Sequence, residues 1–572
     1  MTGRVTSTIS ERQQALQVRF PVWIPRTLDQ VLDAVADECG DRPLVITDGR
    51  TYTYREIRDW SIRLAQGLRC AGVHTGDHVA LVMANYPEFV ALKYAISRLG
   101  ATAVPINYFN RRDELGYVLC QSDAVALVTM DCFRGLDYLA LLDELMPGWE
   151  SAGGGKDFPR LKKVFVFATA ADGGRSGAAT LKELDAAADG WTPLAERDPT
   201  ATSDIIYTSG TTGNPKGVLI THDKVLRTAY GSAYCRAFVD GHRVVFSLPL
   251  YHVYGYMEGL LASVFARGSI VLQLAFDPVA TLDAIERFQA NDALFVPTMT
   301  LDVLDVLKTR SYALGSLHHL ISSGGISPAR IWAEIFEQLH PQELTTGYGM
   351  TETMGTTTLT RPDDPHERLM KTNGRFRDVG VAGDPTLGGR LVVYKTVDPE
   401  TGLDQPRGAV GELLARGIGV TAGYYNKPAE TAQAIDAAGW LHTGDLGLIG
   451  ADEYLRLVGR VRDCYRCGGE QVIPKEIEDV LVTHPAVAQA LLVAVRDERM
   501  GEIGVAWVVV RDGVRMDAAE LIAYCGARLA RFKVPKYVFP IAAGDIPVTP
   551  VGRPRKFLLA EMATQVVARL RS

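Results

Sequence analysis

The chain has 572 residues, of which 47% are hydrophobic and 22% are charged. A chain of this length exceeds what one compact core supports, so we expect two or more domains. This composition is that of an ordinary globular protein and argues against a disordered chain. The formal net charge of −7 argues against a general nucleic-acid binder, which usually presents a basic field.

Neither a targeting segment nor a membrane span is predicted. The N-terminal stretch lacks the apolar core of a secretory signal, and no window offers about 18–20 uninterrupted apolar residues. The scattered cysteines fit reduced thiols in a cytoplasmic protein. Cys464 and Cys467 form a CxxC pair, but no second pair follows at the spacing of a zinc site.

The first part of the chain alternates amphipathic helices with apolar strands. Apolar residues at helical spacing predict a helix over 54–71, and HVALVM at 78–83 predicts a buried strand. A second helix is expected over 88–100, closed by Gly100, and ATAVPIN (101–107) is the next strand. This order implies parallel sheets covered by helices, and similar units recur further along the chain.

Two later stretches differ from this pattern. Within residues 149–200, the Gly- and Ala-rich stretches ESAGGGKDF (150–158) and ATAADGGRSGAAT (168–180) are expected to form surface loops. From about Leu455 the chain becomes rich in charge and glycine. We therefore predict a large domain over 1–461 and a small α+β domain over 462–572, with the boundary near Arg462. The expected helix, two strands and helix of the small domain lie at 475–483, 488–495, 503–510 and 517–530.

The most informative stretch is YTSGTTGNPKG at 207–217, which follows the apolar end of a strand. It combines Ser and Thr hydroxyls, glycines and Lys216 within a short loop. Glycines let backbone N–H groups turn toward an anion, hydroxyls add hydrogen bonds, and the lysine adds charge. The loop is predicted to bind a polyphosphate, although the GxxxxGK[ST] spacing of the Walker loop is absent.

YTSGTTGNPKGV resembles the phosphate-binding signature of the adenylate-forming superfamily, which includes acyl- and aryl-CoA synthetases, beetle luciferases and peptide-synthetase adenylation domains. Further stretches occur in the family's order, so that the resemblance covers roughly residues 25–560. These stretches are LPLYHVYG (248–255), SSGG (322–325), GYGMTE (347–352), GELLARGIGVTAGYYNKPAET (411–431), GWLHTGD (439–445), GRVRD (459–463), GGEQVIPKEIE (468–478) and RFKVPKYV (531–538).

The pattern and the resemblance imply an α/β fold. A large N-terminal domain would hold parallel and mixed sheets sandwiched by helices, and a small α+β C-terminal domain would be mobile. In this family a carboxylate attacks the α-phosphorus of ATP, giving an acyl-adenylate and pyrophosphate, and a thiol then displaces AMP. Such chemistry depends mostly on positioning and charge neutralisation. The implied cofactors are ATP and Mg²⁺, with coenzyme A as co-substrate.

The resemblance assigns the phosphate and metal residues motif by motif. Thr351 and Glu352 match the pair near the α-phosphate and magnesium. Mg²⁺ takes oxygen ligands, and the implied metal ligands are Thr212 and Glu352. The residues matching the loop that handles the β- and γ-phosphates are Thr208, Ser209, Gly210, Thr211, Thr212 and Lys216.

Other motif positions match the groups that hold the base, the ribose and the acid. Tyr348, beside Gly349, matches the aromatic that stacks on adenine, and Asp445 matches the carboxylate that accepts both ribose hydroxyls. His252 matches an aromatic at the mouth of the acyl pocket. The remaining implied residues are Gly324 and Gly325, which leave room for the purine, Arg460, which reaches ribose and phosphate, and Arg462, the hinge.

Coenzyme A is expected to meet the small domain. The turn Gly468-Gly469-Glu470 matches the one that lines the pantetheine tunnel after rotation, and adjacent glycines let the backbone approach a thiol chain closely. Candidate partners for the nucleotide end of coenzyme A are Arg466, Lys533 and Lys536, although basic residues on a solvated face look the same.

The stretch PVTPVGRPRK at 547–556 departs from the family pattern Pro-x-Thr-x-x-Gly-Lys, whose lysine bridges the carboxylate and the α-phosphate. Arg553 stands at the lysine position. A planar guanidinium is not interchangeable with a compact ammonium group. Three outcomes are open: Arg553 acts as the catalytic cation with altered geometry, Lys556 takes over that role, or adenylation is slow. We favour the first. Pro554 is predicted to open the last helix.

The acceptor and the acid stay open at this level. The motifs favour the acyl-CoA synthetase branch, and no carrier domain follows, but a separate carrier protein is an alternative acceptor. The pocket segments favour an apolar acid: medium or longer acyl, aryl or alicyclic. Residues in those segments are Tyr254, Met299, Gly325 and Met354.

Two other functions would use the same motifs. One is a non-catalytic homologue that binds an acyl nucleotide, and acid-dependent pyrophosphate release would exclude it. The other is a luciferase-like oxygenase, which would consume oxygen after adenylation. We expect a cytoplasmic protein without nucleic acid, with peripheral membrane contact and a homodimer left open.

Overall fold

The computed structural model describes residues 5–170, 173–186, 196–208, 214–324, 329–468, 470–548 and 554–571. The chain divides into two compact units. Unit 1 comprises residues 1–393 and 416–441, and unit 2 comprises residues 394–415 and 442–572. Unit 2 therefore includes more of the chain than the predicted small domain. The predicted role of Arg462 is that of a hinge about which the small domain rotates, and it stays a prediction.

Unit 1 contains two seven-stranded sheets, each with one antiparallel pair at an edge and parallel pairs elsewhere. The first has the order β11 (Lys216–Thr221), β10 (Thr202–Thr208), β4 (Thr102–Pro105), β3 (His78–Val82), β5 (Ala124–Met130), β8 (Lys163–Phe167) and β9 (Ala179–Thr180). The second has the order β16 (Glu343–Thr345), β15 (His319–Ser322), β14 (Asp292–Phe295), β12 (Arg243–Phe246), β13 (Ser269–Leu272), β1 (Pro43–Ile46) and β2 (Thr51–Thr53).

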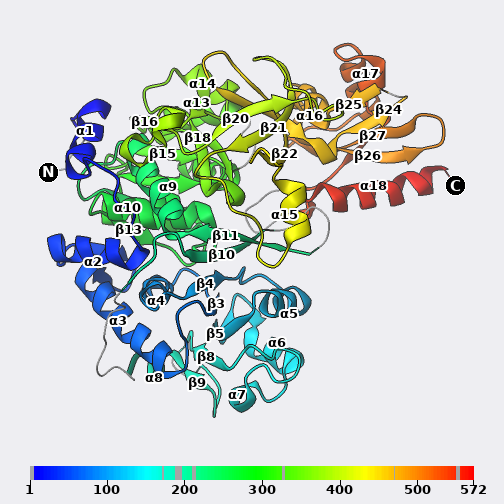
Figure 1. Cartoon of the computed structure of the whole chain (residues 1–572). Coiled ribbons are helices and arrows are strands. Elements are labelled where there is room, and N and C mark those ends of the chain that lie inside the picture. The colour runs from blue at the N-terminus through cyan, green and yellow to red at the C-terminus, as the bar shows by residue number, and fades with distance from the viewer. Residues whose placement is uncertain are drawn as a thin grey trace. The chain divides into compact units, whose positions relative to one another are not determined.

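Helices cover both faces of the first sheet. In Figure 1 its strands stand between α3 (Tyr54–Cys70), α4 (Pro87–Arg98) and α8 (Leu181–Ala186) on one side and α5 (Arg112–Gln121) and α6 (Tyr138–Leu145) on the other. A parallel strand covered on both faces is a continuous apolar run, as in the fully buried β5. The predicted α/β fold and the first two predicted helices and strands are confirmed.

One strand lies between the two stretches that were predicted as surface loops, and it was not predicted. The run KVFVF forms β8 and joins the sheet beside β5, because its apolar residues are buried there. The remaining helices of unit 1 are α1 (Ile9–Arg19), α2 (Leu28–Cys39), α7 (Trp149–Ala152), α9 (His222–Cys235), α10 (Ala262–Phe265), α11 (Pro278–Phe288), α12 (Pro297–Leu307), α13 (Ala329–Gln338), α14 (His366–Lys371), α15 (Pro428–Ala434) and the π-helix η1 (Tyr254–Leu261). A small sheet is formed by β17 (Gly347–Met350), β18 (Gly355–Leu359) and β19 (Arg375–Phe376), and a hairpin by β6 (Cys132–Phe133) and β7 (Leu136–Asp137).

A buried charge network crosses the second sheet. Asp292, at the start of β14, is fully buried and lies 2.6 Å from Nη2 of Arg236. Its Oδ2 also accepts hydrogen bonds from His242 (3.3 Å) and His319 (3.0 Å). Burial alone would raise the pKa of Asp292, but the charges of Arg236 and His319 hold it well below its usual range. Burial lowers the pKa of His242 to about 4, so that ring is neutral near pH 7.

Unit 2 holds two sheets. One is β20 (Val393–Val397), β21 (Gly411–Arg416), β22 (Leu441–Ile449) and β23 (Leu455–Arg460). The other is β25 (Glu470–Val472), β24 (Tyr465–Cys467), β27 (Gly501–Val510) and β26 (Val487–Asp497), with β28 (Tyr537–Pro540) paired to β27.

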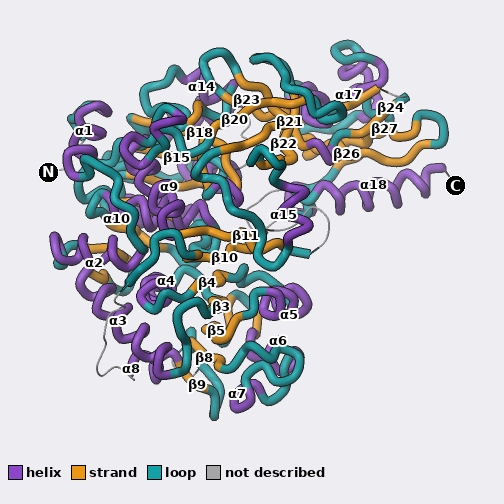
Figure 2. The backbone as a smooth tube through the Cα atoms, viewed as in Figure 1, coloured by secondary structure: helices purple, strands orange, loops and turns teal. Residues whose placement is uncertain are grey.

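Alternate residues of β26 serve two separate cores. Ala490 and Leu492 face the cluster that includes α16 (Pro474–Val482) and α17 (Ala518–Gly526). Leu491 and Val493 face the cluster of α18 (Lys556–Arg571), which runs beside β26 (Figure 2). A strand whose side chains alternate between two faces is expected to divide its packing in this way.

The helices and strands expected in the small domain are present, with ends shifted by a few residues. The expected role of Pro554 is wrong, because α18 begins at Lys556 and Pro554 instead forms an isolated β-bridge with Val548. Among the described residues, no helix is long and apolar enough to cross a membrane.

We expect Asp292→Ala to destabilise unit 1 by about 3–5 kcal/mol, since it leaves Arg236 as an uncompensated buried charge. Urea unfolding would measure the change. The control is Asp305→Ala, which removes an exposed ion pair with Lys308 and should change the unfolding midpoint little. Equal midpoints for the two variants would contradict a stabilising role for the network.

Candidate active site

The predicted phosphate loop joins two paired strands. Thr208 ends β10 and lies opposite Lys216, which begins β11, and the Thr208 hydroxyl donates to the Lys216 carbonyl at 3.5 Å. The antiparallel pairing fixes both ends of the loop at one edge of the first sheet. Ser209, Gly210, Thr211 and Thr212 lie outside the described residues.

The segment 421–425 lies along β11 and carries Tyr424 to this edge. The N–H of Leu219 donates to the Gly423 carbonyl (3.1 Å), and the N–H of Tyr425 donates to the Gly217 carbonyl (2.8 Å). The Lys216 ammonium lies 4.9 Å from the centre of the Tyr424 ring. A cation over an aromatic face is attracted by the ring's negative charge density.

Tyr424 also forms a hydrogen bond with Glu352, the predicted metal ligand. Its hydroxyl donates to Oε1 of Glu352 at 3.0 Å, and both side chains are largely buried. Burial raises the pKa of Tyr424, and the negative charge of Glu352 raises it further, so the phenol stays protonated as a donor. Lys216, Tyr424 and Glu352 therefore form one array.

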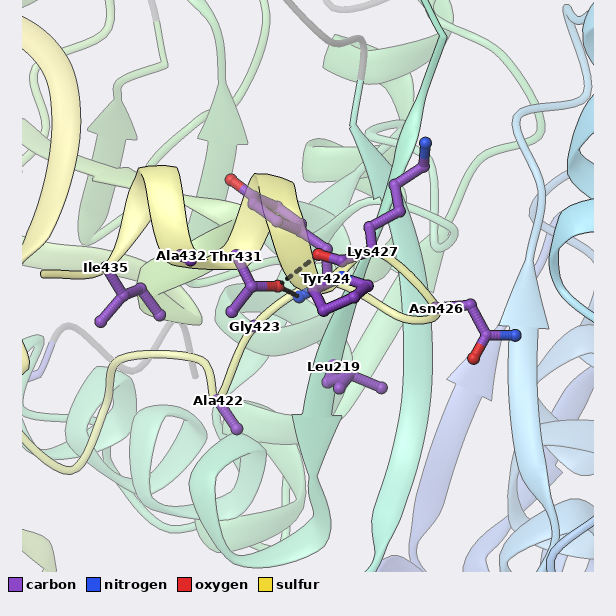
Figure 3. A pocket seen from close by; sticks show the side chains of 10 residues that line it. Leu219, Ala422, Gly423, Tyr424, Asn426, Lys427, Thr431, Ala432 and Ile435 are labelled. Atoms are coloured by element: carbon purple, nitrogen blue, oxygen red, sulfur yellow. Dashed lines mark hydrogen bonds between the residues drawn. The ribbon is translucent and has the colours of Figure 1, made fainter. Parts of the chain in front are cut away.

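The backbone beneath Tyr424 is itself fixed. The Thr431 hydroxyl of α15 accepts from the Tyr424 N–H (3.0 Å) and donates to the Lys427 carbonyl (2.8 Å), as Figure 3 shows. These residues border a cavity of about 470 Å³ next to β11. The hydrogen bonds restrain the direction in which the Tyr424 ring leaves the backbone.

The GYGMTE motif forms β17 and the start of a short 3₁₀ turn. Thr351 and Glu352 are both buried in that turn, and the Glu352 carbonyl accepts from the Thr421 N–H at 2.8 Å. A β-carbon at Gly349 would lie 1.7 Å from the Gly355 carbonyl oxygen. Only glycine allows this close approach of β17 and β18, which places Glu352 at the hairpin end.

The residues predicted to hold adenine lie close to each other in unit 1. The Ser323 hydroxyl donates to the Gly347 carbonyl at 2.7 Å, which joins the end of β15 to β17. Gly324 follows with φ +86°, a conformation that favours glycine, and Tyr348 is largely buried on β17. Gly325 lies outside the described residues.

His252 lies just before the π-helix η1. Its Nδ1 accepts a hydrogen bond from the Tyr254 N–H at 3.2 Å. The neutral ring therefore carries its proton on Nε2. Because the bond fixes the ring on the N-terminal end of η1, His252 is oriented by the same element that carries Tyr254.

The predicted ribose residues lie in unit 2. Asp445 on β22 faces Arg460 on β23, and Nε of Arg460 lies 3.1 Å from Oδ1 of Asp445. Arg462 follows in a 3₁₀ turn, 3.6 Å from the Asp463 carboxylate. Burial lowers the pKa of Arg462, and the charge of Arg460 lowers it further. The antiparallel pairing thus brings Asp445 and Arg460 together.

The described residues of unit 2 that are predicted to bind coenzyme A form hydrogen bonds or ion pairs within that unit. Gly468 has φ +61° and donates its N–H to the Met500 carbonyl at 2.8 Å, whereas Gly469 lies outside the described residues. Each candidate cation has an acidic partner. The ion pairs are Arg466 with Glu400, Lys533 with Glu476, and Lys536 with Asp497.

Of the two candidate catalytic cations, the structure describes only Lys556. Lys556 lies 2.6 Å from Oε1 of Glu478, and the same oxygen accepts the Leu492 N–H at 2.8 Å. Lys556 therefore ties the start of α18 to α16 and β26. Arg553 lies outside the described residues.

The CxxC pair has the surroundings of unreactive thiols. Cys467 is buried and Cys464 is half-buried. Burial raises the pKa of Cys464 to about 11, so its thiolate is scarce near pH 7. The thiolate is the form that binds metals and exchanges disulfides.

Tyr424 was missed as a functional residue. It lies within GELLARGIGVTAGYYNKPAET (411–431), a stretch that supports the resemblance by its place in the motif order but assigns no role to Tyr424. The available signal was the pair of adjacent tyrosines, Tyr424 and Tyr425, in a stretch that matches the family's motif order, but nothing in the spacing indicates which of them contacts Glu352.

Comparisons with known proteins agree with the motif order. The AMP-binding enzyme family matches residues 32–425, and its C-terminal domain matches residues 476–553. The chain is 34% identical to the Bacillus subtilis protein YngI, described as an acyl-CoA synthetase, over 95% of this chain and 98% of that protein. It is 31% identical to the mitochondrial medium-chain acyl-CoA ligase ACSF2 of Danio rerio, over 94% and 88%. It is also 31% identical to a feruloyl-CoA synthase of Amycolatopsis, over 86% and 90%.

A solved structure gives the same architecture. ATP-bound MatB from Rhodopseudomonas palustris superposes with a TM-score of 0.81 at 26% identity, over 94% of this chain and 99% of that one. The chain belongs to the AMP-binding enzyme family. It is an AMP-forming acid–thiol ligase that activates a carboxylic acid as an acyl-adenylate and transfers the acyl group to coenzyme A.

We expect Tyr424→Phe to slow acid-dependent ATP–pyrophosphate exchange about tenfold or more, because Glu352 loses the donor that orients it. The matched control is Tyr425→Phe, which removes the neighbouring hydroxyl from Asp123 and should leave exchange within about twofold. Equal losses in both variants would mean that Tyr424 acts only through the stability of the segment.

Proposed function

We propose that this ligase activates an apolar carboxylic acid with Mg²⁺-bound ATP, using Lys216, Tyr424 and Glu352 at the edge of the first sheet. The array of these three side chains carries the proposal, since it joins a cation and a carboxylate through one tyrosine where the predicted phosphate loop ends. The names of the medium-chain and feruloyl relatives support an acyl or aryl acid. An alicyclic acid fits the same requirement.

Glu352 is suited to hold magnesium. Carboxylate oxygens are the ligands that Mg²⁺ prefers, and the hydrogen bond from Tyr424 fixes one of them. Thr212 would be the second protein ligand. The ion would neutralise charge between the carboxylate and the phosphates.

The remaining roles follow the motifs. Thr208 and Thr351 would contact phosphates, Tyr348 would stack on adenine, and Asp445 would accept the ribose hydroxyls while Arg460 reaches the phosphate. Rotation about Arg462 would then bring Gly468 and Gly469 to pantetheine. His252 would stand at the mouth of the acid pocket.

The proposed setting is the cytoplasm, and a carrier protein is the alternative acceptor to coenzyme A. A homodimer would be compatible with the proposed chemistry. Experiments need to vary the carboxylic acid, the metal ion and the thiol acceptor one at a time.

A panel of carboxylic acids, with and without coenzyme A, tests the proposal. We expect AMP and thioester to form with magnesium, ATP, coenzyme A and an apolar acid, as measured by mass spectrometry. Thioester that forms only on a carrier protein would overturn the assignment of coenzyme A as the acceptor. Pyrophosphate release that never depends on an acid would instead favour a non-catalytic nucleotide-binding role.

The catalytic cation is testable by ranking variants. We expect Arg553→Ala to slow adenylation about 100-fold, and Arg553→Lys to preserve or raise it, because a tight site prefers the ammonium group. Lys556→Ala should matter less for the rate but should lower the melting temperature, because Glu478 loses its partner. Glu478→Gln is the matched control and should reproduce that loss of stability. The opposite ranking of rates would assign the role to Lys556.

A further inference from the structure

The last residue of α5 joins two segments of the candidate active site. Gln121 is half-buried, and its Oε1 accepts a hydrogen bond from the hydroxyl of Tyr207, where the predicted phosphate loop begins. Its Nε2 donates to the carbonyl of Tyr425 at 2.8 Å. One amide therefore connects α5 to β10 and to the segment that carries Tyr424.

The partners fix the direction of this amide. A carbonyl oxygen only accepts hydrogen bonds, so the NH₂ group of Gln121 faces Tyr425 and the amide oxygen faces Tyr207. Burial raises the pKa of Tyr207, so the phenol keeps its proton near pH 7 and acts as the donor. A side chain that only donates or only accepts would make one of these two contacts at most.

The residues after α5 hold side chains of the same segment. Asp123, which has φ +52°, accepts from the Tyr425 hydroxyl (2.9 Å) and from Nδ2 of Asn426 (3.0 Å) through Oδ2. The contact from Gln121 differs because it reaches the backbone of Tyr425, so it does not depend on that hydroxyl. It restrains the main chain one residue from Tyr424.

The attachment of α5 to unit 1 does not depend on this bridge. Leu115, Val118 and Leu119 are almost fully buried and secure the helix by apolar packing. Gln121 lies beyond them at the end of the helix and is only half-buried. Its two hydrogen bonds therefore contribute more to the arrangement of the site than to the stability of the helix.

We propose that Gln121 is a positioning residue for adenylation, which holds the segments of Lys216 and Tyr424 in register with each other. Tyr207 lies on β10 opposite the start of β11, where Lys216 lies, and Tyr425 follows Tyr424. Gln121 acts on the reaction through these two tyrosines. The inference rests on the proposed function, because it supports the array that is proposed to act on Mg²⁺-bound ATP.

Gln121→Met tests this role, because a thioether of similar length cannot donate and accepts only weakly. The assay is ATP–pyrophosphate exchange with a medium-chain fatty acid or ferulic acid, whichever the wild-type chain activates faster. We expect the KM for ATP to rise about tenfold, while the KM for the acid stays within about twofold. A lower melting temperature with an unchanged KM for ATP overturns the proposal, and so does an equal rise in both KM values.

Tyr207→Phe distinguishes a bridge from two independent effects. It should raise the KM for ATP about threefold, because the hydrogen bond to Gln121 is lost. The double variant of Tyr207→Phe with Gln121→Met should match Gln121→Met alone, since the hydroxyl acts through the amide. Effects that multiply in the double variant overturn the bridge.

Gln121→Glu is a second variant at the same position, and it decides the matter if Gln121→Met does not fold. The carboxylate still accepts from Tyr207 but has no donor for the Tyr425 carbonyl. We expect it to raise the KM for ATP at least as much as Gln121→Met does. A KM for ATP equal to that of the wild type overturns the role of the donor.

Gln13→Met is the matched control. Gln13 is a half-buried glutamine of α1, and its Nε2 donates to the Tyr234 carbonyl at 3.2 Å, away from the residues assigned to the reaction. The KM for ATP should stay within about twofold of the wild type, and a rise as large as that of Gln121→Met overturns the proposal. A wild-type chain without acid-dependent exchange would count against the proposed function itself.

Discussion

The backbone hydrogen bonds between β11 and the segment 421–425 are the interaction on which the site of unit 1 depends. They bring a stretch from 200 residues further along the chain to the end of the phosphate loop. Tyr424 then reaches both Lys216 and Glu352. Because backbone pairing sets register, a shift by one residue would turn Tyr424 to the other face and replace it with Gly423 or Tyr425. Strand pairing thus sets the relative positions of Lys216, Tyr424 and Glu352.

Unit 1 contains several charges that are fully buried, and each is paired. Asp292 with Arg236 joins the second sheet to the end of α9, and Glu258 with Arg377 joins η1 to the residue that follows β19. Such pairs add little net stability compared with apolar residues, but they penalise any packing that separates the partners. In this chain the two pairs share a contact, because Arg236 also donates to the Glu258 carbonyl at 2.7 Å.

The sequence patterns predicted the elements whose periodicity is strong. The strands at 78–82 and 102–105 and the helices that flank them appear as expected, because apolar spacing reports burial directly. The strand at 163–167 was hidden by the Gly- and Ala-rich residues around it. Motif matching selected Glu352 and Asp445 as candidate residues, since their neighbours in sequence are distinctive. It could not indicate Tyr424, because its contact with Glu352 joins residues 72 positions apart in the chain.

The division of β26 between two cores has a consequence for local unfolding. Leu559, Ala563 and Val567 attach α18 to one face of the sheet, while α16 and α17 pack on the other face around different residues. Regions that share few buried contacts can open at different free energies. We therefore expect the C-terminal helix to open at a free energy of its own, with the ion pair of Lys556 and Glu478 as the contact that couples it to α16. Exchange of its amide hydrogens would report on the attachment of that helix separately from the folding of the rest of unit 2.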